Sequence, residues 1–127
     1  MPAPRRKILN IAKTDDLLKP RSAILEQAGY QVVPALTLLN LERACETQGD
    51  FDLVIIGSVL PRDEKRRAMT AVRKSCGDVP ILELYQPGTE PVDEQAQEQL
   101  AGDEETALLA KVAEVIAKPR RRRRGAS

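Results

Sequence analysis

The 127-residue chain contains no histidine and no tryptophan, and its aromatic residues are limited to Tyr30, Phe51 and Tyr85. Without histidine, the chain lacks the commonest general base and the commonest ligand of transition metals. The core must therefore be aliphatic, and a hydrophobic fraction of 42% is sufficient for one domain of this length. No apolar run approaches the roughly 18 residues that a membrane-spanning helix needs.

Cysteine is also scarce, since only Cys45 and Cys76 are present. Both fall in predicted helices, and together they offer too few ligands for a zinc site. The first residues, Met-Pro-Ala-Pro-Arg-Arg, lack the apolar segment of a signal peptide. We therefore expect two reduced cysteines that pack in the core of a cytoplasmic protein, with no cofactor and no membrane span.

Short apolar runs alternate with helix-forming segments over the first two thirds of the chain. The run Leu53–Ile56 is unbroken and rich in β-branched residues, which indicates a strand buried on both faces. Similar runs at Lys7–Ala12, Tyr30–Val33 and Val79–Leu84 predict three further strands. Alternation of this kind is typical of an α/β fold, in which one doubly wound parallel sheet has helices on both faces.

Local signals predict where the intervening helices begin and end. Pro20 suits the first turn of a helix that stops at Gly29, and Pro34 is expected to end the second strand. Thr37 and Asp63 are the predicted N-caps of the next two helices. The predicted outward face of the helix after Asp63 is basic, with Lys65, Arg66, Arg67, Arg73 and Lys74.

The pattern weakens after Tyr85. Asp93–Ala101 is rich in strong helix formers, so we predict a short helix there, with a fifth strand over about Ala96–Ala101 as the alternative. Glu104–Ala117 is predicted to form an amphipathic helix that closes the domain. We expect a domain over residues 7–117, an N-terminal extension over 1–6 and a disordered Arg-rich tail over 118–127.

Two stretches carry a resemblance to a known family. Leu25-Glu-Gln-Ala-Gly-Tyr-Gln-Val-Val33 leads into the second strand, and Phe51-Asp-Leu-Val-Ile-Ile-Gly-Ser-Val-Leu-Pro61 holds the central strand and its exit loop. With them, residues 7–117 resemble the receiver domain of bacterial two-component response regulators. The resemblance implies a flavodoxin-like (CheY-like) sheet of strand order 2-1-3-4(-5), altered around the fourth helix and fifth strand. It also implies a role in phosphorelay signal transduction with a signalling protein as partner.

The residues that a receiver uses for phosphorylation are missing at the matching positions. The resemblance places the phosphoryl-accepting aspartate at Gly57, the acid pair that holds Mg²⁺ at Ala12 and Lys13, and the conserved hydroxyl of the family at Tyr85. No Lys-Pro pair follows a fifth strand, and the pair Lys118-Pro119 comes after the last predicted helix. An acyl phosphate needs a carboxylate, and Mg²⁺ prefers oxygen ligands. We therefore expect a degenerate pseudo-receiver with no catalytic residue and no bound Mg²⁺.

Several neighbouring side chains are weaker candidates for this chemistry. Ser58 could replace the acceptor, but a loop serine is the favoured interpretation. Asp15 and Asp16 could approximate the acid pair, but a role at a helix N-terminus is favoured. Tyr85 could close over the crevice or pack at the sheet edge, and the sequence leaves both open.

Charge is distributed unevenly along the chain. Residues 1–117 carry 14 positive and 19 negative charges, whereas Lys118 and Arg120–Arg124 add six positive charges and no negative ones. Arg120, Arg121, Arg122, Arg123 and Arg124 could bind DNA, RNA or another acidic surface without reading sequence, or could bind nothing specific. The alternative function is thus a nucleic-acid-associated adaptor. A small enzyme is disfavoured, because no dinucleotide, P-loop or nucleophile-elbow motif occurs.

Overall fold

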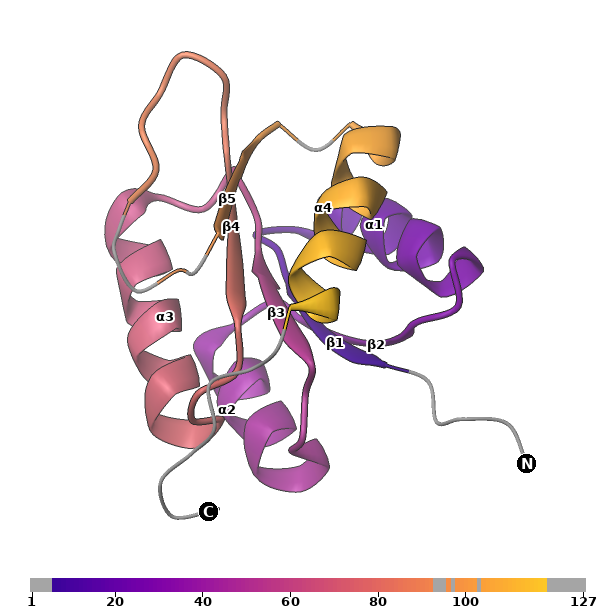
Figure 1. Cartoon of the computed structure of the whole chain (residues 1–127). Helices are drawn as coiled ribbons and strands as arrows, with labels where there is room; N and C mark the ends of the chain where they lie inside the picture. Colours follow the sequence, from indigo (N-terminus) through magenta and orange to yellow (C-terminus); the bar gives the residue numbers. More distant parts are fainter. Residues whose placement is uncertain (1–5, 93–95, 97, 103, 119–127) are drawn as a thin grey trace, which may run out of the picture.

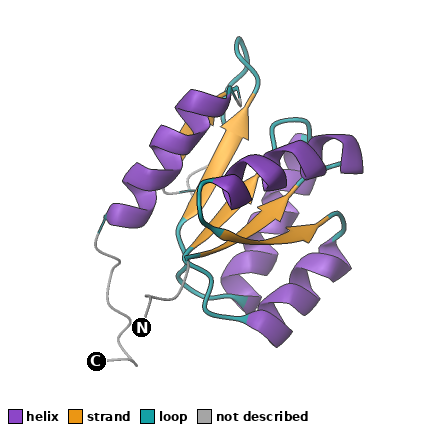
Figure 2. Cartoon of the chain, turned by 90° about the vertical axis from the view of Figure 1, so that its right-hand side faces the viewer, coloured by secondary structure: helices purple, strands orange, loops and turns teal. Residues whose placement is uncertain are grey.

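The computed structural model describes residues 6–92, 96, 98–102 and 104–118. These residues form one parallel sheet of order β2-β1-β3-β4-β5 with helices on both faces (Figures 1 and 2). The strands are β1 (Lys7–Ile11), β2 (Gln31–Ala35), β3 (Leu53–Ile56), β4 (Ile81–Tyr85) and β5 (Glu98–Ala101). The helices are α1 (Asp15–Gln27), α2 (Leu38–Gln48), α3 (Arg62–Ser75) and α4 (Glu105–Ala117). The predicted α/β class and strand order are confirmed.

The core has two halves, one on each face of the sheet. Helices α2 and α3 bury Leu41 and Met69 on one face, while α1 and α4 bury Leu25 and Val112 on the other. Strand β3 lies in the middle, and all four of its residues are fully buried, as its unbroken apolar run predicts. None of the described helices is long and apolar enough to cross a membrane.

Two of the predicted helix starts are wrong, and one is confirmed. Thr37 caps α2, because its Oγ1 accepts a hydrogen bond from the Asn40 amide at 3.0 Å. Helix α1 begins at Asp15, so Pro20 lies inside the helix, at an exposed position, and not in its first turn. Helix α3 begins at Arg62, so Asp63 lies in its first turn and is not its cap.

Strand β2 continues through Pro34 to Ala35, so the prediction that proline ends it is wrong. Pro34 pairs with Asn10 in the register between β2 and β1. Because β2 is an edge strand, the missing amide proton of a proline can face away from the sheet at no cost to the ladder.

The helix predicted over residues 93–101 is wrong where the structure describes that segment. Glu98–Ala101 forms β5, which runs parallel to β4 with Leu100 opposite Leu84. Pairing with β4 outweighs the helix propensity of four residues, because propensity differences are only tenths of a kcal/mol each. Between β4 and β5 no helix occurs among the described residues, so the expected alteration of this region is confirmed.

The two cysteines form a disulfide, so the expectation of reduced thiols is wrong. Cys45 lies in α2, Cys76 is the C-cap of α3, and their Cα atoms are 5.1 Å apart. The side-by-side packing of α2 and α3 brings together two residues that are 31 positions apart in the sequence. The distance is within the range that a disulfide spans.

Candidate functional site

Three of the four positions singled out from the sequence lie at the carboxyl edge of the sheet. Ala12 directly follows β1, Gly57 directly follows β3, and Tyr85 is the last residue of β4. Because β1, β3 and β4 are neighbours in the sheet, these residues lie side by side along one edge. The Gly57 amide donates to the Ile11 carbonyl at 2.9 Å, which extends the pairing of β1 and β3 to this point. Ala12 and Gly57 are buried, and Tyr85 is half-buried.

The fourth position, Lys13, is directed to α3. Its Nζ atom lies 2.9 and 3.1 Å from the two carboxylate oxygens of Glu64, and both side chains are exposed. Asp15 and Asp16 are exposed in the first turn of α1, in agreement with the favoured role at a helix N-terminus. Ser58 is a half-buried residue of the loop between β3 and α3.

An arginine that the sequence reasoning missed occupies the space beside Gly57. Arg21 of α1 is only 5% exposed, and its Nη1 donates to Asn10 Oδ1 at 3.0 Å and to the Ile11 carbonyl at 3.4 Å. A Cβ atom on Gly57 would lie 3.3 Å from both Nη atoms and 3.1 Å from the Ile11 oxygen. The guanidinium group therefore lies close beside Gly57, and a side chain there would need it to move by a few tenths of an ångström.

Asn10 holds this guanidinium in place. It is fully buried in β1, and its Nδ2 donates to Ser22 Oγ at 2.9 Å and to the Leu18 carbonyl at 3.3 Å. Its oxygen is thereby turned to Arg21. The sequence does contain a signal for this cluster, because Arg21 is spaced three residues from Leu18 and four from Leu25, on the buried face of α1.

Comparison with solved structures decides the fold. The chain resembles CheY4 of Vibrio cholerae, a chemotaxis response regulator, with a TM-score of 0.72 and 24% identity over 88% of this chain and 99% of that one. It also resembles the receiver domain of a sensor histidine kinase of Pseudomonas aeruginosa, whose structure has a magnesium ion coordinated in the active-site cleft (TM-score 0.75, 18% identity, 91% and 100% covered). The signal receiver domain of an HD domain-containing protein of Pseudomonas fluorescens Pf-5 gives 0.75 with 14% identity, covering 89% and 95%.

The chain has the receiver fold. No protein-family model and no curated protein matches the sequence. At these identities the likeness establishes the fold, and function must be argued from the residues themselves.

The residues at the carboxyl edge of this receiver fold do not fit a magnesium ion. Mg²⁺ is held by oxygen ligands, usually carboxylates. Ala12 and Gly57 have no side-chain oxygen, Lys13 carries a positive charge, and a second cation, the Arg21 guanidinium, lies beside Gly57. In the part of the chain that the structure describes, no group of three or more Cys, Asp or Glu residues could hold a metal ion.

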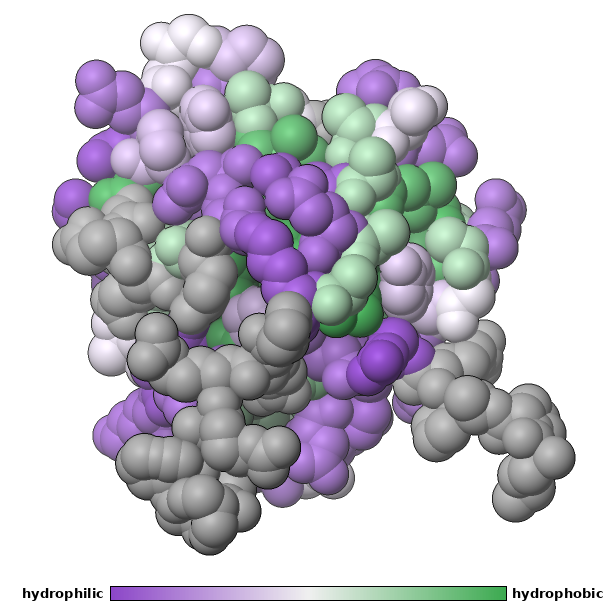
Figure 3. All heavy atoms as spheres, viewed as in Figure 1, coloured by the Kyte–Doolittle hydropathy of each residue, from purple (hydrophilic) through white to green (hydrophobic). Residues whose placement is uncertain are grey.

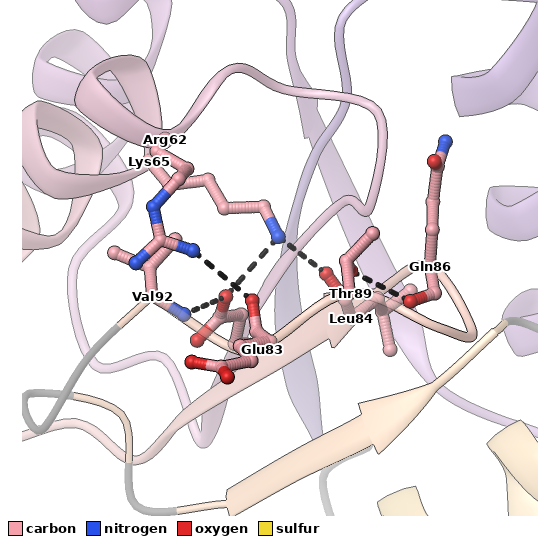
Figure 4. Close-up of polar contacts among 8 residues, drawn as sticks. Arg62, Lys65, Glu83, Leu84, Gln86, Thr89 and Val92 are labelled. Atoms are coloured by element: carbon pink, nitrogen blue, oxygen red, sulfur yellow. Dashed lines mark hydrogen bonds and ion pairs between the residues drawn. The ribbon is translucent and has the colours of Figure 1, made fainter.

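A second buried polar cluster lies between α3 and β4 (Figure 4). Lys65 is 4% exposed, so its predicted place on the outward face of α3 is wrong. Its Nζ lies 3.1 Å from Glu83 Oε2 and donates to the Leu84 carbonyl at 2.8 Å. The reason is helical spacing, because Lys65 shares the buried face of α3 with Ala68, Met69 and Val72.

The Glu83 carboxylate also accepts a hydrogen bond from the connection between β4 and β5. Its Oε2 accepts a hydrogen bond from the Val92 amide at 2.7 Å, while its Oε1 is buried and has no hydrogen-bond partner among the residues that the structure describes. Two residues before Val92, the Glu90 carbonyl accepts a hydrogen bond from Arg62 at 3.2 Å (Figure 4). A glutamate inside the apolar run of β4 is the sequence signal for such a cluster, because a buried carboxylate requires partners.

Ion pairs join β5 to α4 on the face shown in Figure 3, which is largely hydrophilic at its centre. Lys111 Nζ lies 3.3 Å from Glu98 Oε1, and Lys118 Nζ forms an ion pair with Glu98 Oε2. The hydrogen bonds from Lys118 and Lys111 hold the pKa of Glu98 below its usual value, and Glu98 raises the pKa of Lys118. The Arg120–Arg124 segment, for which we predict disorder and polyanion binding, lies outside the described residues.

Proposed function

We propose that this chain is a phosphorylation-incompetent receiver-like domain that acts as a protein–protein interaction module in two-component signal transduction. The receiver domains that it resembles belong to a chemotaxis response regulator and a sensor histidine kinase, which supports the signalling context. The module comprises residues 7–117, acts without catalysis and is placed in the cytoplasm, where such pathways operate.

The observation that carries the proposal is the position of Arg21. Its guanidinium lies against Gly57, at the position that corresponds to the acceptor aspartate by the resemblance. An acyl phosphate cannot form without a carboxylate, and Gly57 has no side chain to supply one. Phosphoryl transfer depends on positioning and on neutralising charge with a metal, and the residues at Ala12 and Lys13 support neither.

Phosphorylation mimics test this proposal directly. Acetyl phosphate with Mg²⁺, or beryllofluoride with Mg²⁺, is added to the isotope-labelled full chain, and amide spectra are recorded by NMR. We expect no shift changes at Ala12, Gly57, Ser58 and Tyr85 and no phosphoryl adduct in the mass spectrum. Saturable shifts at these amides, or a phosphorylated species, would overturn the proposal.

A second candidate function follows from the five consecutive arginines, Arg120–Arg124. In this alternative the chain is an adaptor that binds nucleic acid or another polyanion through its C-terminal segment. The receiver fold would then present the segment to the rest of a complex.

A further inference from the structure

The two cysteines of the Cys45–Cys76 disulfide differ in their access to solvent. Cys45 lies in the last turn of α2, is only 5% exposed and belongs to the core on this face of the sheet. Cys76 is half-buried at the end of α3, where it is the C-cap and packs against the same core. A reagent from solution therefore meets Cys76 before Cys45.

Contacts that do not depend on the disulfide hold the ends of both helices in place. Lys7 Nζ donates to the carbonyl of Gly49, the C-cap of α2, at 3.2 Å. Arg73 Nη1 donates to the carbonyls of Gly77 and Val79, just after α3, at 3.0 and 2.6 Å. Each cation ties down the chain where it leaves its helix, so the two cysteines should stay close together after the bond is reduced.

The apolar packing of α2 against α3 is also independent of the bond. Leu41 of α2 and Met69 of α3 are buried in the same cluster as Cys45. Free cysteine behaves as a small apolar residue, so two thiols suit this cluster. Reduction should therefore leave the fold intact, with two thiols ready to close again, because groups held side by side react as if at high concentration.

We propose that Cys45 and Cys76 form a reversible redox pair. In this pair Cys76 exchanges with low-molecular-weight thiols and disulfides, and Cys45 resolves the mixed disulfide that results. The pair is a modification site separate from the carboxyl edge of the sheet, and the assignment does not depend on the proposed function. If the proposed function holds as well, thiol oxidation gives the module an input that needs no phosphoryl group.

Oxidation by a low-molecular-weight disulfide such as glutathione disulfide takes two steps. The Cys76 thiolate attacks one sulfur of the reagent, whose S–S bond breaks, and one glutathione leaves as a thiolate. The Cys45 thiolate then attacks Cys76 Sγ, expels the second glutathione and closes the protein disulfide. The two protons of the protein thiols end on the two glutathione thiols, so two electrons pass from the protein to the reagent. Two glutathione molecules reverse the same steps.

Closing the bond restrains α2 against α3 at their C-terminal ends. Oxidation should therefore slow amide hydrogen exchange in these two helices, because it opposes their local opening. Helices α1 and α4 pack on the other face of the sheet and serve as the internal control, with exchange that should not change. Equal exchange in the reduced and oxidised chain would show that the bond restrains nothing and would contradict this part of the inference.

A redox titration of the full chain tests whether the pair is reversible. The protein is equilibrated at graded ratios of reduced to oxidised glutathione, starting from either form, and its free thiols are alkylated and counted by mass spectrometry. We expect both forms to be populated within the series, the two directions to agree, and both forms to keep the circular dichroism of the folded chain. A pair that stays closed or open throughout, or a reduced chain that unfolds, would overturn the inference.

Single variants test the roles of the two cysteines. With glutathione disulfide, Cys45→Ala should gain one glutathione at Cys76, whereas Cys76→Ala should react about tenfold more slowly, because Cys45 is reached only after local opening. The double variant Cys45→Ala/Cys76→Ala should gain none.

Brief alkylation of the reduced parent chain, followed by peptide mapping, makes the same comparison without a substitution, and Cys76 should be labelled first. Equal rates, or earlier labelling of Cys45, would overturn the assignment of the two roles. None of these outcomes changes the response to acetyl phosphate, so this inference and the proposed function can fail separately.

Discussion

At the scale of single residues, Lys65 and Glu83 form a buried salt bridge. Both are almost completely buried, and the cost of removing two charges from water is offset only while the pair is intact. Lys65→Met should therefore lower the free energy of unfolding by about 3–5 kcal/mol, because Glu83 keeps the Val92 amide as a partner but has a buried charge that has lost its cation. Urea unfolding of the variant and the parent chain measures the difference.

An exposed ion pair on the same helix is the matched control. Arg67 Nη2 lies 2.9 Å from Asp63 Oδ2 with both side chains well exposed, so Arg67→Met should leave the free energy of unfolding almost unchanged. The double variant Lys65→Met/Glu83→Leu should recover much of the stability lost in Lys65→Met, since neither charge is left. Equal costs for Lys65→Met and Arg67→Met would contradict the view that the buried pair acts as a unit.

Residues of this kind mark the limit of what the sequence predicts about the site. The sequence predicts where the strands end, and from these ends it follows that Ala12, Gly57 and Tyr85 lie at one edge of the sheet. The sequence analysis predicts Lys65 on the outward face and makes no prediction for Arg21, because charged residues are mostly exposed in folded proteins. Their spacing on α1 and α3 indicates the buried face, but their partners, Asn10 and Glu83, come from strands that only the folded sheet brings near.

At the scale of elements, the pairing of α2 with α3 is reinforced by the Cys45–Cys76 disulfide. Closing a loop of 31 residues restricts the unfolded chain, so the bond should contribute roughly 2–4 kcal/mol to stability. We expect the protein purified without reductant to show no free thiols and to unfold at lower urea concentration after treatment with dithiothreitol.

The double variant Cys45→Ala/Cys76→Ala is the control for this prediction, because its stability should not respond to dithiothreitol. Thiol alkylation in freshly lysed cells then reports the state of the pair in its own compartment. Free thiols in the purified, unreduced protein would contradict the disulfide. Thiols found free only in the cell would show a pair kept reduced by a cytoplasmic pool.

The elements themselves differ in how far the sequence predicts them. Strands β1 to β4 are short apolar runs bounded by turn residues, so the local sequence predicts them. Helix α4 has a clear amphipathic period, which predicts it in the same way. Strand β5 has the sequence Glu-Gln-Leu-Ala, which favours a helix by propensity and has one large apolar residue. Its pairing with β4 and its ion pairs to α4 are tertiary contacts, so the local sequence pattern cannot predict them.

At the scale of the whole molecule, charge of opposite sign is separated between the body and the C-terminal segment. The net charge of residues 1–117 is −5, so the body repels polyanions, although α3 carries more cations than acids. Lys118 pairs with Glu98 and Glu114, whereas Arg120–Arg124 form the longest run of positive charge in the sequence. This segment and α3 are therefore the two candidate binding sites for nucleic acid that we compare.

Removing Pro119–Ser127 distinguishes the two places and leaves the Lys118–Glu98 pair intact. If the segment binds polyanions, the full chain should bind double-stranded DNA of arbitrary sequence at low salt, with a slope of log K against log salt of up to about −4 to −5 for five neutralised phosphates. The truncated chain should not bind, and a chain with all five arginines changed to serine should match it. Binding retained after truncation would move the activity to α3, and a full chain that fails to bind at low salt would exclude the adaptor function.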